Sequence, residues 1–192
     1  MKRLLVLVEG QTEEAFVRDV LTPHLNEHRV HPESVLLKTP LPDTGAAGPS
    51  DFPGMRKRPP SDPYARISVV ENAFAEVIDE PRFIPHLVLH ELEAWVYSAP
   101  DACSWVFDAE AVAQKLASIA NGAGGPERIN EDPNTAPSKR LMNVFPQYQK
   151  TLHGPMALEA IGLSRVRAQC PHASSWLERL EQLGLQGQMD SK

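Results

Sequence analysis

An apolar, β-prone run over residues 3–8 ends abruptly in Glu9-Gly10, and an amphipathic segment over residues 12–28 follows it. The run is typical of a buried parallel strand that ends in a turn. The segment after it repeats apolar residues at helical spacing, and Pro23 should kink or split that helix. A strand, a turn and a helix in this order begin an α/β unit with a mostly parallel sheet.

The rest of the chain divides into a loop-rich middle and a helical end. Residues 34–37 predict a second strand, and residues 38–63 predict an irregular loop because they lack a period and are rich in Pro, Gly, Asp and Ser. Residues 66–78 are amphipathic, and the apolar run over 84–90 predicts a strand that leads into a helix at Glu91. Further helices are predicted over 109–120, 137–144, 155–161, 164–170 and 173–183, the last stopped by Gly184.

These segments predict a single domain over 1–192, since a chain of this length can bury one sizeable core. Its α/β core would cover 1–100, including the irregular loop over 38–63. The helical part over 101–192 would pack on that core. Proline makes up 18 of the 192 residues, and the prolines gather between Pro32 and Pro63, so the middle of the chain should be the least regular part.

Composition and charge narrow the class of protein. The hydrophobic content of 42% is too high for a disordered chain, and no apolar run approaches the roughly 20 residues that span a membrane. Two cysteines, Cys103 and Cys170, exclude a disulfide scaffold and predict a reduced, cytoplasmic protein in which both are small core residues. A net charge of −6 argues against holding nucleic acid by bulk electrostatics, so such a partner would need metal ions, local contacts or a second protein.

Two acidic clusters lie where strands are predicted to end. Glu9 and Glu13 follow the first run, and Glu91 and Glu93 follow the run over 84–90. Because ligands collect at the carboxyl ends of parallel strands, these carboxylates predict a Mg²⁺ or Mn²⁺ site. The alternative is that acids in a first helical turn only complement the helix dipole, which explains Glu13 equally well. A carboxylate that ends a buried strand, as Glu9 would, is unfavourable unless it is paired or binds a cation.

A third cluster begins the helix predicted over 137–144. Lysine and arginine are unfavourable at the positive end of a helix dipole, so basic residues there indicate a bound anion. Ser138, Lys139 and Arg140 are therefore predicted to bind a phosphate or carboxylate. A pairing of Lys139 with Glu131 or Asp132 explains the pattern nearly as well.

Other motifs are weaker. His24 and His28 stand four residues apart on a predicted helix, where they form either a transition-metal site or, as we favour, a pair of exposed histidines. A zinc-protease motif starting at His90 is excluded because Ala94 occupies the position of the second histidine. A phosphate-binding glycine loop is absent, so the chain should not hydrolyse ATP by itself.

The motif series resembles an uncharacterised bacterial family, domain of unknown function 4276. The matching residues are Glu9-Gly10-Gln11-Thr12-Glu13, Arg82-Phe83-Ile84-Pro85-His86, His90-Glu91-Leu92-Glu93-Ala94, Ile129-Asn130, Thr135-Ala136-Pro137-Ser138-Lys139-Arg140-Leu141 and Cys170-Pro171-His172. The family in turn resembles Toprim-type nucleases of the overcoming-lysogenisation-defect kind. This resemblance implies a Rossmann-like Toprim core that binds Mg²⁺ or Mn²⁺ and cleaves DNA or RNA, often beside a partner ATPase in phage defence.

The resemblance also implies roles for individual residues. Glu9 would be the Toprim glutamate, Glu13 its companion, and Glu91 and Glu93 the later acidic pair. Lys139 would stabilise charge on the phosphate.

The chain departs from the family pattern after residue 37, where a strand carrying a metal-binding aspartate is missing. Asp43 and Asp51 are acids that remain in that stretch. The leading hypothesis is therefore a metal-dependent nuclease, and the alternative is a catalytically weakened Toprim-like structural or regulatory subunit. A small-molecule phosphatase is a third, weaker hypothesis.

Overall fold

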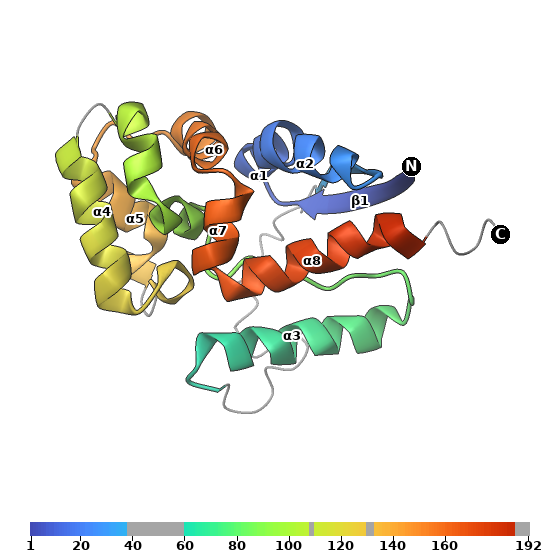
Figure 1. Ribbon diagram of the computed structural model, residues 1–192. Helices are drawn as coiled ribbons and strands as arrows, with labels where there is room; N and C mark the ends of the chain where they lie inside the picture. Colours follow the sequence, from blue (N-terminus) through green and yellow to red (C-terminus); the bar gives the residue numbers. More distant parts are fainter. Residues whose placement is uncertain (38–59, 108–109, 130–132, 187–192) are drawn as a thin grey trace. The chain divides into compact units, whose positions relative to one another are not determined.

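The computed structural model describes residues 1–37, 60–107, 110–129 and 133–186 (Figure 1). The chain forms two compact units, one from Met1–Lys38 with His90–Lys192 and one from Thr39–Leu89. The single domain expected over 1–192 stays a prediction. The loop predicted over 38–63 lies almost entirely outside the described residues.

The first unit begins with a strand, helix and strand, as the sequence predicts. Strand β1 (Lys2–Val8) pairs in parallel with β2 (Val30–Leu36), in a register that places Lys2 opposite Val30 and Val8 opposite Leu36. The sheet has these two strands in the part of the chain that the structure describes. The fold is therefore mixed α/β and mostly helical.

The crossover between the strands consists of α1 (Gln11–Phe16), the π-helical turn η1 (Val17–Leu21) and α2 (Thr22–Glu27). Pro23 alters the helix, as expected, but does not break it: it stands in the first turn of α2, cannot donate to the preceding turn, and that turn is π-helical. The backbone N–H of Thr22 donates to the Val17 carbonyl five residues earlier, and its hydroxyl donates to the same oxygen at 2.7 Å. The wide turn thus accommodates the proline without a break.

The side chains of β1 are less buried than predicted. Its residues alternate, with Leu5 and Leu7 exposed by 55% and 57%, and Val8 buried. A parallel strand is apolar on both faces when helices cover both. Here α1, α2 and α8 (Pro171–Gln186) contact the sheet, and Leu5 and Leu7 are exposed within the described part of the first unit.

Helices build the rest of the first unit. The 3-10 segments η3 (Leu92–Ser98) and η4 (Pro100–Phe107) are followed by α4 (Glu110–Ala123), η5 (Pro126–Arg128), η6 (Pro133–Thr135) and four further helices. These are α5 (Pro137–Val144), α6 (Lys150–Ile161), α7 (Leu163–Gln169) and α8. Trp95 of η3 is 1% exposed and packs edge-to-face on Phe16 of α1, with ring centroids 5.3 Å apart. Both cysteines are buried as expected, and burial raises the pKa of the Cys103 thiol to about 12.

The second unit contains α3 (Pro63–Ile78), which Asp62 caps by accepting the N–H of Ala65 at 3.0 Å. The strand predicted over 84–90 is wrong, because these residues are not paired into a sheet. Pro85 has no N–H to donate, and the Leu87 N–H donates instead to the Glu71 carboxylate on α3 at 2.8 Å. An extended apolar run becomes a strand only where a neighbouring strand is available.

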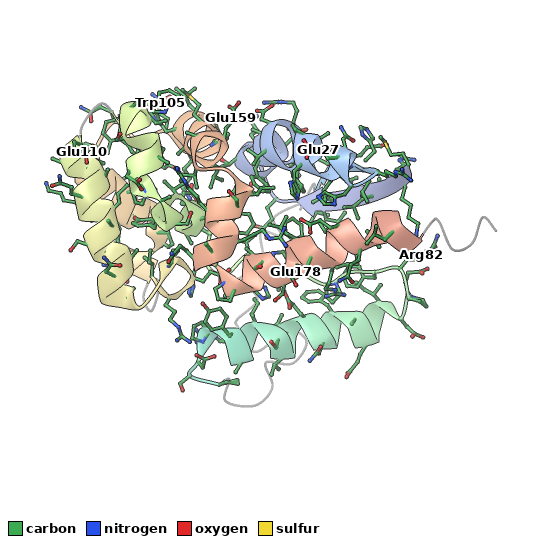
Figure 2. All side chains as sticks on the ribbon, viewed as in Figure 1. Glu27, Arg82, Trp105, Glu110, Glu159 and Glu178 are labelled. Carbon is green, nitrogen blue, oxygen red and sulfur yellow. The ribbon has the colours of Figure 1, made fainter. Side chains whose placement is uncertain are left out.

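Acidic side chains on the surface of the first unit account for part of the negative charge. Glu27, Glu110, Glu159 and Glu178 are all exposed, and Figure 2 shows them at the surface. Among the described residues, no helix combines the length and apolar character that crossing a membrane would require.

Candidate functional site

The turn into η3 places two glutamates, Glu91 and Glu93, in different surroundings. His90 has a left-handed backbone (φ 69°), and Glu91 is extended before η3 begins. Glu91 remains partly exposed at 27% of its side chain, whereas the side chain of Glu93 is only 4% exposed. This turn therefore places one carboxylate at the edge of the unit and the other inside it.

Glu91 binds the start of α5. It accepts the Ser138 backbone N–H at 2.8 Å and the Ser138 hydroxyl at 3.0 Å, and it accepts from the Lys150 ammonium at 3.1 Å. Burial acts to raise the pKa of Glu91, but the hydrogen bonds from Ser138 and Lys150 outweigh it and hold that pKa below its usual range. Glu91 is therefore ionised at neutral pH.

The pKa of Glu93 is shifted in the opposite direction. Burial raises the pKa of Glu93, and the Lys150 ammonium, 3.5 Å from its Oε1, only partly offsets that effect. Oε1 has no hydrogen-bond partner among the described residues. A buried carboxylate oxygen in this condition is costly, which makes it a candidate ligand for a cation.

Tyr148 connects this pair of glutamates to the start of α1. Its hydroxyl is buried beside Glu93, and burial together with that carboxylate raises the pKa of Tyr148. A Cβ on Gly154 would lie 3.0 Å from that hydroxyl and 3.4 Å from the Thr12 methyl group. The absence of a side chain at Gly154 thus lets α6 approach α1 at this point.

Gly154 thus brings Thr12, the residue before Glu13, close to Tyr148. Glu13 is half-buried in the first turn of α1, and a Cβ on Gly10 would lie 3.2 Å from its Oε2. Glu9 is exposed, so burial does not by itself require a cation there. No three of the carboxylates of Glu9, Glu13, Glu91 and Glu93 offer ligand atoms within 4.8 Å of one another in the described chain. Their metal role stays a prediction.

The anion predicted at the start of α5 is the carboxylate of Glu91. Ser138 donates to it twice, so this helix N-terminus binds an anion from the chain itself. Lys139 is exposed, and Arg140 donates to the Thr135 carbonyl at 2.9 Å. The alternative partners of Lys139, Glu131 and Asp132, lie outside the described residues.

Sequence reasoning missed Lys150 and Tyr148. The predicted helix began at Pro155, whereas α6 begins at Lys150 and includes Pro155. Lys150 stands 59 residues from Glu91, in a segment without periodicity or motif. No sequence signal connects these residues.

The opposite pKa shifts of the two glutamates predict opposite pH effects on stability. Because the pKa of Glu93 is raised, its contribution to stability is present at low pH and is lost as the pH rises through the raised value. Glu93→Gln should therefore raise the thermal midpoint at pH 7 by about 2 °C, and the gain should vanish near pH 4. Circular dichroism melts from pH 4 to 8 measure this difference.

Glu91→Gln is the matched control with the opposite sign. The lowered pKa of Glu91 contributes stability above its unfolded-state value, and this contribution is lost as the pH falls. Glu91→Gln should lower the midpoint at pH 7 and approach the wild type at low pH. A constant difference across the pH range would contradict either assignment.

Comparison with known proteins gives one match. A family model described as Domain of unknown function (DUF4276) matches residues 8–181. The chain belongs to this family. No curated protein and no solved structure matches it. The match runs from the last residue of β1 into α8 and includes Glu91, Glu93, Ser138 and Lys150, so this member of the DUF4276 family carries the candidate site within the matched region.

Proposed function

We propose that this DUF4276 chain is a divalent-metal-dependent phosphodiesterase of the nuclease class, centred on Glu91, Glu93 and Lys150. The observation that carries the proposal is the buried Glu93 carboxylate, whose Oε1 makes no regular hydrogen bond among the described residues and lies 3.5 Å from the Lys150 ammonium, beside a second, ionised carboxylate. Two carboxylates that share a single ammonium have oxygen atoms suited to a hard cation. Glu13 and Glu9 at the start of α1 are the further candidate ligands.

The residues have distinct roles in this proposal. Glu91 and Glu93 would hold Mg²⁺ or Mn²⁺, and the ion would supply an activated water and neutralise the scissile phosphate. Ser138 orients Glu91 through two hydrogen bonds. Lys150 carries the positive charge at the centre and would pair with a phosphate oxygen, a role first expected of Lys139.

The wider setting of this proposal comes from the family resemblance. A Toprim-type core, a DNA or RNA substrate and a partner ATPase in phage defence belong to the same hypothesis. The net charge of −6 suits a substrate that is held through metal or a partner rather than by a basic surface.

A second candidate is a structural or regulatory subunit with weakened catalysis. It is favoured by the position of Lys150, whose ammonium already lies 3.1 Å from Glu91 and 3.5 Å from Glu93. With Ser138 also donating to Glu91, the cluster has the form of an internal ion-pair network that fastens η3 to α5 and α6. The shortened stretch after residue 37, which lacks the expected aspartate, points the same way.

Cleavage assays distinguish the two candidates. Supercoiled plasmid, linear DNA and RNA are incubated with the protein and Mn²⁺, Mg²⁺ or EDTA. We expect metal-dependent cleavage that falls at least about 100-fold in Glu93→Gln and in Lys150→Met. Lys115→Met, at an exposed position on α4, is the control and should cleave like the wild type.

The outcomes test both the kind of protein and the location of its active centre. Cleavage by the wild type that persists in Glu93→Gln would support an enzyme but would show that its active centre is not at Glu93. A wild type without cleavage and without Mn²⁺ binding by calorimetry would reject the enzyme and leave the subunit.

A further inference from the structure

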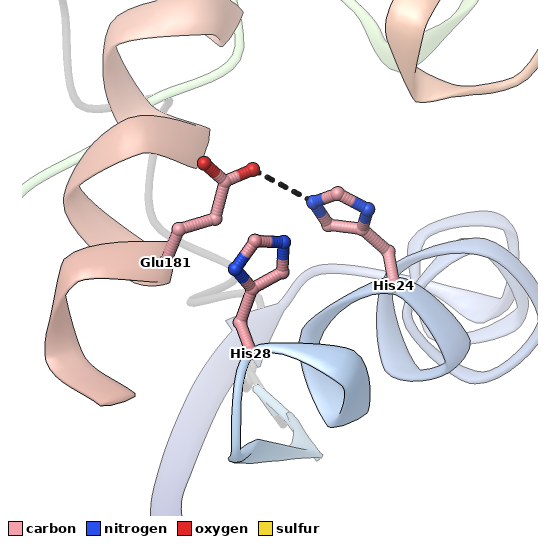
Figure 3. A group of neighbouring side chains, drawn as sticks. All are labelled: His24, His28 and Glu181. Carbon is pink, nitrogen blue, oxygen red and sulfur yellow. Dashed lines mark hydrogen bonds and ion pairs between the residues drawn. The ribbon is translucent and has the colours of Figure 1, made fainter. Parts of the chain in front are cut away.

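We propose that His24, His28 and Glu181 form a three-ligand site for a Zn²⁺ ion, separate from the glutamates around η3. His24 and His28 come from α2 and the residue that ends it, and Glu181 comes from α8 (Figure 3). One ligand atom from each residue lies within 4.8 Å of the other two. All three side chains are partly buried.

The two histidines are aligned by helix geometry. Residues four apart lie on the same face of a helix, and the ring centroids of His24 and His28 are 5.0 Å apart. Figure 3 shows both rings directed toward the Glu181 carboxylate. Two imidazoles presented at this spacing are a common basis for a zinc site.

Glu181 completes the set from a distant part of the chain. Its Oε1 lies 2.8 Å from Nε2 of His24. Ligands bonded to Zn²⁺ at about 2.0–2.1 Å lie roughly 3.3 Å apart in a tetrahedron, so the ion would enter after His24 and Glu181 separate slightly and Arg167, which donates to the same Oε1, moves off that oxygen. Exposed fractions of 26% for His24 and 16% for Glu181 leave the pair accessible while removing most of the competing water.

The contact between α8 and the end of α2 holds the ligands at this distance. A Cβ on Gly184 would lie 1.8 Å from the His28 carbonyl oxygen, so only a glycine permits the helices to approach this closely. Glu181 stands one turn before Gly184. The close approach therefore presents Glu181 to the histidines as a consequence of backbone packing.

Neighbouring groups orient the carboxylate and leave a side open. Arg167 of α7 forms an ion pair with Glu181 and a second one with Glu178 at 3.7 Å. An open pocket of about 660 Å³ is lined by His24 and Arg167, together with Asp19, Ser164 and others. This pocket reaches the site at His24, so it would give the ion a route to that ligand and would give a water or an anionic group space beside Arg167.

The donor set selects the kind of metal. Imidazole nitrogen suits Zn²⁺ and the later first-row ions, whereas Mg²⁺ and Mn²⁺ prefer oxygen ligands. Two imidazoles and a carboxylate with an open fourth position match the three-ligand zinc sites of metalloenzymes. The site is thus chemically different from the all-oxygen cluster of Glu91 and Glu93.

Zinc titration calorimetry on the full-length protein, with any histidine tag removed, tests the proposal. We expect the wild type to bind Zn²⁺ with micromolar or tighter affinity in the presence of excess Mg²⁺. His28→Ala and Glu181→Gln should each lose one equivalent of zinc or weaken its binding at least tenfold. Circular dichroism must show both variants folded.

Cobalt substitution is a second test of the same site. The wild type loaded with Co²⁺ should show the visible absorption of a tetrahedral ion, and His28→Ala should not.

Two control variants make the outcome specific. His31→Ala removes an exposed histidine outside the group and should bind zinc like the wild type. Glu93→Gln should also bind zinc normally, which separates this site from the proposed nuclease centre. Unchanged zinc binding in folded His28→Ala, an equal loss in His31→Ala, or no binding by the wild type would overturn the proposal.

Discussion

Gly184→Ala should lower the free energy of unfolding of the first unit by about 3 kcal/mol. The added methyl group would lie 1.8 Å from the carbonyl oxygen of His28, a backbone atom that cannot rotate away. The helix α8 would have to move off the sheet and the end of α2. Urea unfolding followed by tryptophan fluorescence measures the loss, because Trp95, Trp105 and Trp176 all lie in the first unit.

Gly122→Ala is the matched control for this effect. Gly122 lies in α4 near its end, and a Cβ there would have no atom within 4 Å. Alanine is the better helix former, so this variant should be more stable by about 0.5–1 kcal/mol. Equal effects of the two substitutions would mean that helix propensity, and not the contact with His28, governs Gly184.

Glu127→Ala should lower the free energy of unfolding by about 3 kcal/mol. Glu127 of η5 is only 1% exposed, and its two oxygens accept the backbone N–H groups of His172 and Ala173, each at 3.0 Å. These N–H groups belong to the first turn of α8, where no partner exists within the helix. Alanine would leave both of them without an acceptor and open a cavity in the core.

Two further variants help to separate the loss of the hydrogen bonds made by Glu127 from the loss of its side-chain volume. Glu127→Gln preserves the shape but keeps one acceptor oxygen, so its loss should be smaller than that of alanine. Glu110→Ala removes an exposed acid from the first turn of α4 and should change stability by about 0.5 kcal/mol or less. A Glu127→Ala protein as stable as Glu110→Ala would show that the α8 N-terminus obtains its hydrogen bonds elsewhere. The same fluorescence measurement serves for all three.

The helices were the most predictable part of the fold. The helix predicted over 137–144 matches α5, and those over 164–170 and 173–183 match α7 and the interior of α8. Apolar spacing and Pro137 in a first turn are local features that act within one element. The strand over residues 3–8 was predicted for the same reason, whereas β2 (Val30–Leu36) begins four residues before the strand predicted over 34–37.

Errors arose where an element depends on a distant neighbour. Gly184 was expected to stop the last helix, but α8 continues through it to Gln186. Its small size serves the contact with His28 instead. Likewise, residues 84–90 have the composition of a strand but pair with no strand among the residues that the structure describes, and Leu5 and Leu7 were expected to be buried.

For the candidate sites, too, local features could be predicted from the sequence and contacts between distant residues could not. The sequence alone determined that His24 and His28 share a helix face, and it predicted an anion at the start of α5 and Glu91 and Glu93 as candidate ligands. Only the tertiary structure decided that the anion is Glu91, 47 residues from Ser138, and that Lys150 joins it from 59 residues away. It also placed Glu181 against His24 across 157 residues. Spacing along the chain determines which residues share an element, whereas charge pairing and ligand sets depend on how separate elements pack.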